Sequence, residues 1–140
     1  MKKLFILGVA AMLATGVATT SCSKYDEGSK FTILTKKARV DGDWTVESTE
    51  NNGTITAIPS GESMKMSFKK DNTYTSTYSF GSLSSTETGK WQFSSDKKNL
   101  MMTANGSSTT DQYIIIELKS KEMKIKESTT SNPTTYKLVQ

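Results

Sequence analysis

Residues 63–80 read Ser-Met-Lys-Met-Ser-Phe-Lys-Lys-Asp-Asn-Thr-Tyr-Thr-Ser-Thr-Tyr-Ser-Phe. An apolar side chain stands at every second position from Met64 to Phe68, which predicts a strand with one buried face. Lys70-Asp71-Asn72 predicts a tight turn, and the half that follows repeats the alternation with aromatic residues. The stretch therefore predicts an antiparallel hairpin whose apolar face lies against a core.

The same alternation runs from residue 43 to the end of the chain, with turn residues every 8–12 positions. The run 113–116 is apolar on both faces, so its register stays open. Residues 50–61 are interpreted as a loop that begins with the turn Asn51-Asn52-Gly53. Ahead of the strands, residues 31–40 predict a short helix at one end of the domain, with an extended plug as the alternative. The predicted strands cover residues 43–49, 63–69, 73–80, 85–93, 99–103, 110–118, 122–127 and 134–139.

Eight antiparallel strands with short sequential connections predict an all-β, eight-stranded up-and-down barrel, because closure removes the exposed sheet edges. A two-sheet sandwich is the alternative. A barrel of this size is either filled by its own side chains or holds one small ligand.

The amino-terminal segment predicts a secretory leader. Lys2 and Lys3 precede an apolar run of residues 4–17, which is too short to span a bilayer as a permanent helix. The only cysteine, Cys22, follows this run after four small residues, 18–21. We therefore expect a signal peptide over 1–21, a lipidated tether and short lead-in over 22–37, and the barrel domain over 38–140.

Thr19-Thr20-Ser21-Cys22 resembles a bacterial lipobox in the relaxed form of Bacteroidota lipoproteins. This resemblance implies a diacylglycerol on the Cys22 thiol and a further fatty-acyl chain, such as palmitate, on the new amine. Two or more chains anchor a protein stably, so the expected location is the bacterial outer membrane. Lys24-Tyr25-Asp26-Glu27 resembles the export signal of surface lipoproteins, which adds cell-surface exposure as an expectation. An ordinary signal peptide followed by a free cysteine is the alternative.

Composition excludes several classes of site. The chain has no histidine and one cysteine, which excludes Ser-His-Asp and Cys-His catalysis and ordinary zinc sites. Its acidic residues are scattered over different predicted strands, so no carboxylate pair is expected. The net charge is +4, or +2 without Lys2 and Lys3, and Arg39 is the only arginine. We therefore expect no enzyme activity, no metal, no cofactor and no nucleic-acid partner.

Gly42-Asp43-Trp44 at the entry to the first strand resembles the Gly-x-Trp signature of lipocalins, whose tryptophan closes one end of the barrel. Three further segments carry the resemblance: 68–74 (Phe-Lys-Lys-Asp-Asn-Thr-Tyr), 89–93 (Gly-Lys-Trp-Gln-Phe) and 122–125 (Glu-Met-Lys-Ile). Over 38–139 the chain is similar to the lipocalin-like domain of Bacteroidota lipoproteins. It departs from lipocalins near the final strand, where Lys137 stands in place of the usual arginine.

The resemblance implies a non-catalytic barrel that binds a small hydrophobic ligand. On this interpretation Gly42 and Trp44 form a structural plug at one end, and Tyr74 and Tyr78 offer polar contacts. The same inward residues would also make a plain filled core, and the alternative function is an accessory or host-contact module of the envelope. The expected ligand-binding residues are Met64, Met66, Phe68, Tyr74, Tyr78, Trp91, Phe93, Met102 and Met123.

Overall fold

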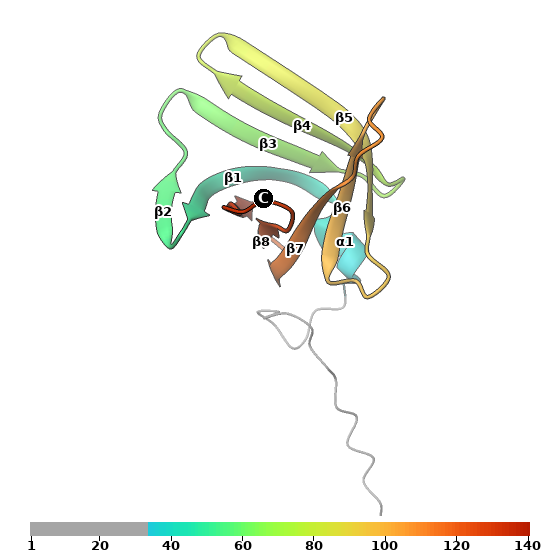
Figure 1. The fold of residues 1–140 in the computed structure, drawn as a ribbon. Helices are drawn as coiled ribbons and strands as arrows, with labels where there is room; N and C mark the ends of the chain where they lie inside the picture. The colour runs from blue at the N-terminus through green and yellow to red at the C-terminus, as the bar shows by residue number, and fades with distance from the viewer. Residues whose placement is uncertain (1–33) are drawn as a thin grey trace, which may run out of the picture.

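The computed structural model describes residues 34–140 (Figure 1). The expected signal peptide, Cys22 and most of the tether lie outside these residues. Within 34–140 no helix is long and apolar enough to cross a membrane. The elements are α1 (Lys36–Val40), β1 (Gly42–Asn51), β2 (Thr54–Ala57), β3 (Glu62–Phe68), β4 (Thr73–Phe80), β5 (Leu83–Phe93), β6 (Asn99–Ala104), β7 (Asp111–Leu118), β8 (Glu122–Glu127) and β9 (Thr135–Val139).

The strands form one antiparallel sheet that closes on itself. Its order is β2-β1-β3-β4-β5-β6-β7-β8-β9, and β1 also pairs with β9. The last pairing joins the opposite side of β1 to the final strand and closes a barrel of eight strands, with β2 as an addition outside the ring. The predicted all-β, eight-stranded barrel is therefore confirmed, and the sandwich alternative is wrong.

The predicted loop over 50–61 is partly wrong, because it contains β2. Asn52 and Gly53 both adopt positive φ, at 49° and 81°, and two such residues make the tight turn that suits a two-residue hairpin. All four residues of β2 are exposed, with Ile55 at 69%. A strand without a buried face shows no alternation of burial, so its sequence lacks the signal used for the others.

One end of the barrel is closed by α1 and the two tryptophans. Trp44 Nε1 donates to the Val40 carbonyl at 2.8 Å, and Trp91 Nε1 donates to the Lys69 carbonyl at 3.0 Å. The buried Arg39 donates from Nη1 to the Leu118 carbonyl at 2.9 Å. The short helix predicted within 31–40 is thus confirmed over Lys36–Val40, whereas residues 31–33 lie outside the described residues. We call this end of the barrel the closed end; it also holds the turns 69–72, 94–98 and 119–121.

The core fills the barrel toward the closed end. Phe68 and Phe93 both meet Trp91 edge-on, each with ring centroids 5.7 Å apart. Gly89 lets β5 approach this core, since a Cβ there would lie 2.2 Å from the Thr103 carbonyl oxygen. The buried apolar residues are Val40, Trp44, Val46, Met66, Phe68, Tyr74, Trp91, Leu100, Met102, Ile115, Leu118, Met123, Ile125 and Leu138.

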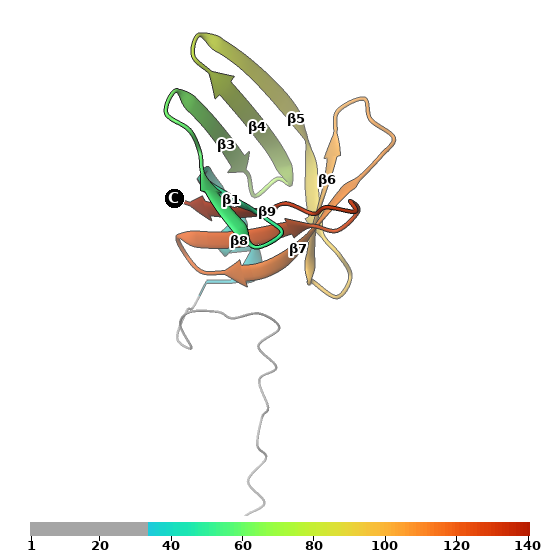
Figure 2. The same ribbon diagram turned by 60° about the vertical axis from the view of Figure 1, so that its left-hand side comes forward.

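At the other end, β3, β4 and β5 extend beyond the rest of the barrel (Figure 2). β1 pairs with β3 only from Lys65 to Phe68, and β6 pairs with β5 only from Gly89 onward. Residues 62–64 of β3 and 83–87 of β5 therefore pair only with residues 76–80 of β4, which lie between them. We call these three segments the flap, and the end that carries it the open end.

Candidate binding site

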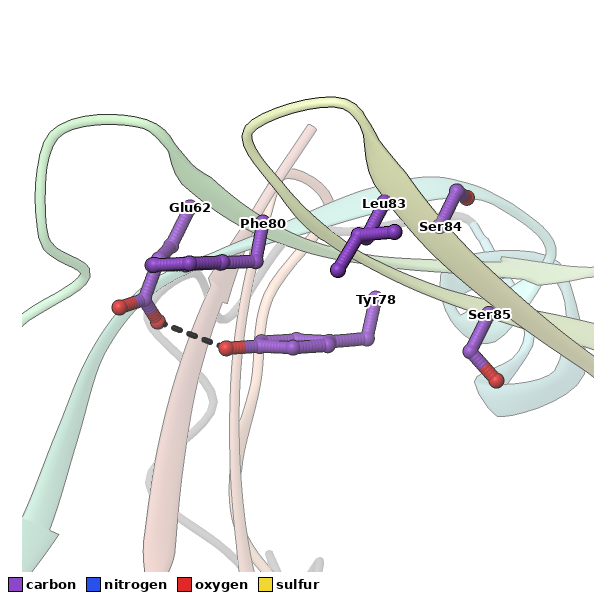
Figure 3. Close-up of a pocket in the computed structure, with 6 residues that line it drawn as sticks. All are labelled: Glu62, Tyr78, Phe80, Leu83, Ser84 and Ser85. Atoms are coloured by element: carbon purple, nitrogen blue, oxygen red, sulfur yellow. Dashed lines mark hydrogen bonds between the residues drawn. The ribbon is translucent and has the colours of Figure 1, made fainter.

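The inner face of the flap lines a hollow of about 480 Å³. Met64 lies on the same face and packs against the core, so this face continues the inner wall of the barrel. Tyr78 and Phe80 project from β4 on the underside of the flap in Figure 3. The lining residues are Glu62, Tyr78, Phe80, Leu83, Ser84 and Ser85.

Two large apolar side chains stand exposed in this hollow. Phe80 and Leu83 are direct cross-strand partners on either side of the turn at 81–82. They are 56% and 71% exposed, and Tyr78 next to them is 42% exposed. Apolar side chains gathered at a concave surface mark a place where another molecule can exclude water. The hollow is therefore the best candidate for a ligand site within residues 34–140.

Two tyrosine–glutamate pairs lie on the inner wall, one within the hollow and one nearer the core. Tyr78 Oη donates to Glu62 Oε2 at 2.9 Å, and Tyr74 Oη donates to Glu87 Oε1 at 2.6 Å. The bond to Glu62, followed by desolvation, raises the pKa of Tyr78, whereas desolvation and then the bond to Glu87 raise the pKa of Tyr74. Both phenols therefore stay protonated at neutral pH and donate to their carboxylates.

A third tyrosine–glutamate pair lies on β8 and β9, toward the open end. Tyr136 Oη donates to Glu127 Oε1 at 2.7 Å, and the Tyr136 ring meets Tyr113 edge-on with centroids 6.3 Å apart. Burial, and then the carboxylates of Asp111, Glu127 and Glu87, raise the pKa of Tyr113 to about 12. One phenol thus experiences the charge of carboxylates from three different strands, so the inner wall here is polar and negative.

The predicted ligand-binding residues divide between the core and the hollow. Six of the nine are buried: Met66, Phe68, Tyr74, Trp91, Met102 and Met123. Met64 and Phe93 are partly buried against them, and Tyr78 alone of the nine lines the hollow. Ligand contact by these residues stays a prediction. Gly42, at φ 137°, and the buried Trp44 lie at the closed end, where a plug was expected.

Two other hollows lie on the outer surface. One, of about 350 Å³, lies over the outward side chains of β1, β3 and β4 around Asp43 and Lys65, and a smaller one adjoins Ile55. Polar residues dominate the first, so it offers little apolar surface to a ligand. Among residues 34–140 no three acidic side chains gather closely enough to hold a metal ion.

Sequence reasoning missed Leu83 and the glutamates of the inner wall. The alternation that placed Met64 inward also places Glu62 inward, since side chains two apart in a strand share a face. The same step from Gly89 reaches Glu87, and from Ile125 it reaches Glu127. Leu83 was missed because the predicted fourth strand began at residue 85, so its cross-strand contact with Phe80 was absent.

Comparisons with known proteins agree with this geometry. A family described as "Lipocalin-like domain" matches residues 40–125. No curated protein matches the chain. Eight chains of solved structures match it; one is the crystal structure of an uncharacterized protein from Bacteroides eggerthii. That structure is 12% identical, covers 71% of this chain and 98% of its own, and has a TM-score of 0.56. At this identity the likeness concerns the fold alone.

Proposed function

This chain belongs to the lipocalin-like domain family, and from that premise we propose that it is a non-catalytic, lipid-anchored binding module of the bacterial envelope. Its ligand is a small apolar molecule held at the open end. The observation that carries the proposal is the pair of exposed side chains, Phe80 and Leu83, in a hollow of about 480 Å³ on the inner face of the flap.

In this proposal the closed end stabilises the barrel and the open end binds the ligand. The closed end is packed around Trp44 and Trp91, and both indole nitrogens donate to backbone carbonyls. Satisfied, buried side chains of this kind hold the barrel in shape. The open end instead leaves apolar area exposed, which a ligand would remove from water at roughly 25 cal/mol per Å².

The test uses the full chain with Cys22→Ser, so that no acyl group competes for the hollow. We expect the neutral dye N-phenyl-1-naphthylamine to bind with a rise in fluorescence. Replacing Phe80 and Leu83 together with serine should abolish binding. The matched control replaces Ile114 and Ile116 with serine. Both are exposed on β7, so this control should leave dye binding intact. No binding by the Cys22→Ser chain, or equal loss in both double variants, contradicts the proposal.

Anchoring through Cys22 is a separate part of the proposal. It is supported by the lipobox-like residues 19–22 and by the apolar run 4–17 before them. Cys22→Ser should abolish labelling by radioactive palmitate and release the protein from the membrane fraction. Protease treatment of intact cells then distinguishes a surface location from a periplasmic one. Continued labelling of the serine variant refutes the anchor.

A second candidate is an interaction module, and the free edges of the flap favour it. Residues 83–87 of β5 pair with β4 but not with β6, so their other edge can accept a strand from a partner protein. A photocrosslinking residue in place of Thr86 should then yield a defined adduct in cells. The same residue in place of the exposed Thr45 should yield none, and no adduct at either position rejects this candidate.

A further inference from the structure

Charge is segregated along the barrel axis. The turns of the open end, 52–53, 58–61, 81–82, 105–110 and 128–134, contain no lysine or arginine. The closed end carries most of the cations in its helix and turns: Lys36, Lys37, Lys69, Lys70, Lys97, Lys98, Lys119 and Lys121. A cation approaching the molecule is therefore attracted toward the open end and repelled from the closed one.

The two faces of the sheet also differ in charge, because the outer face carries lysines together with carboxylates such as Asp43 and Glu47. The strand lysines alternate with buried residues such as Met66, Trp91 and Leu138, which places them on the outer face. These lysines are Lys65, Lys90, Lys124, Lys126 and Lys137. The inner wall toward the open end carries acidic side chains instead, on four strands: Glu62, Glu87, Asp111 and Glu127.

Within the hollow itself, Glu62 is the only charged lining residue, and Glu87 lies two residues beyond Ser85 on the same face of β5. The apolar surface of Phe80 and Leu83 lies beside them. A ligand that fits both features has an apolar body and a positive group. A fatty acid fits the apolar surface but brings its carboxylate against Glu62.

We propose that the hollow binds an amphiphilic amine, whose apolar body lies on Phe80 and Leu83 and whose ammonium group lies against Glu62 and Glu87. This inference rests on the proposed function and adds the charge of the ligand to it. The tyrosine rings add to the attraction, because the face of an aromatic ring favours a cation. Tyr78 keeps its bond to one Glu62 oxygen, and the other oxygen of that carboxylate can accept from the ammonium group.

The experiment compares decylammonium, decanol and decanoate, which share one chain and differ in charge. Each displaces N-phenyl-1-naphthylamine from the full chain carrying Cys22→Ser, at low ionic strength. We expect decylammonium to bind at least about tenfold more tightly than decanoate, a difference of about 1.4 kcal/mol, with decanol between them. Added salt should shrink this ratio, because the carboxylates are reached by solvent.

Variants connect the preference to the proposed residues. Replacing Glu62 and Glu87 with glutamine keeps acceptors for both phenols, and should bring decylammonium and decanoate to within about threefold of each other. The control is Glu50→Gln, which removes a charge from the outer face of the barrel. It should leave the ratio of decylammonium to decanoate affinity unchanged. Thermal unfolding of each variant checks that it is folded.

The outcomes separate the two proposals. If decanol binds as tightly as decylammonium, the charge preference is wrong while the apolar site stands. If none of the three binds, the proposed function fails as well. A concentration-dependent dimer in sedimentation, abolished by replacing Phe80 and Leu83 with serine, would show that a second copy covers the hollow and would overturn the amine proposal.

Discussion

Single aspartates set two of the hairpin turns at the closed end. Asp71 Oδ1 accepts from the Thr73 amide and hydroxyl at 3.0 and 2.6 Å, and Asp96 Oδ1 accepts from the Lys98 amide at 3.0 Å. An aspartate at the start of a turn can bond backbone amides two residues on, and the sequence predicted the first of these turns at Lys70-Asp71-Asn72. Residues with such a local role are the ones that sequence identifies best.

The Asp71 turn makes a prediction about pH. The bonds from Thr73 lower the pKa of Asp71 from its ordinary 3.8, so folding favours the ionised carboxylate. Its stabilising effect is therefore full above pH 3.8 and is lost as the pH falls through the lowered pKa. In urea unfolding, Asp71→Ala should be less stable than wild type at pH 7, and the gap should narrow in acid.

The control for this prediction is Asp71→Asn, which keeps an acceptor oxygen and cannot titrate. Its stability relative to Asp71→Ala should not vary with pH. If the difference in unfolding free energy between wild type and Asp71→Ala stays constant down to pH 2, ionised Asp71 does not stabilise the turn.

Gly89 makes a prediction about packing. A Cβ at this position would lie 2.6 Å from the Tyr74 ring and 2.9 Å from the Ala104 Cα, as well as against the Thr103 carbonyl. Two of these neighbours are backbone and cannot turn aside. Gly89→Ala should therefore cost about 1–3 kcal/mol of unfolding free energy, measured by urea denaturation. Ser85→Ala on the same strand is the control and should stay within about 0.5 kcal/mol.

At the scale of elements, sequence identified each strand that has one buried face and failed where that pattern was absent or broken. β4 and β8 were predicted with their observed bounds. β7 could not be given a register from sequence, because Ile114 and Ile116 are apolar although they are 39% and 42% exposed. Its pairing with β8 also shifts between Ile115 and Glu117. Ile116 is the extra residue of this bulge, so two neighbouring positions lie outside the core, which simple alternation does not anticipate.

The bulge predicts that alanine substitutions at two adjacent isoleucines change the unfolding free energy by very different amounts. Ile115 is 4% exposed in the core, whereas Ile116 is 42% exposed. Ile115→Ala should cost about 2–5 kcal/mol of unfolding free energy through the cavity it leaves. Ile116→Ala should stay within about 0.5 kcal/mol. Equal losses in chemical denaturation would contradict the register seen here.

At the scale of the whole molecule, the barrel was predictable but the candidate site was only partly so. Each regular strand and turn has its own local sequence signal. Eight such strands with short connections predict a closed sheet, because closure removes the exposed edges. The hollow instead depends on where pairing stops: β5 passes beyond β6, and β3 passes beyond β1. The positions at which two strands part depend on their relative lengths and register. No single stretch of sequence encodes that difference, so Tyr78 was anticipated and Leu83 was not.

The flap makes a prediction about local stability. Residues 83–87 lack a second neighbouring strand, whereas residues 89–93 of the same strand pair with β6. Amide groups with fewer ladder bonds open at lower free energy than the core. Hydrogen exchange should therefore be faster in 83–87 than in 89–93, and bound decylammonium should slow it in the flap. Uniform protection along β5 would contradict this difference.

The lysine-rich closed end has a consequence for how the barrel is oriented in an electric field. The closed end carries eight lysines against the turn acids Asp71 and Asp96, while the inner wall toward the open end carries acids without lysines, so the barrel is an electric dipole. α1 and Leu34, where the described chain begins, adjoin the positive end. If the chain is anchored through Cys22, as proposed, each lysine near a leaflet rich in anionic lipid would gain about 1 kcal/mol, and this field would turn the closed end toward the bilayer. In that orientation the hollow would face the surrounding water and would meet molecules that arrive from outside the bilayer.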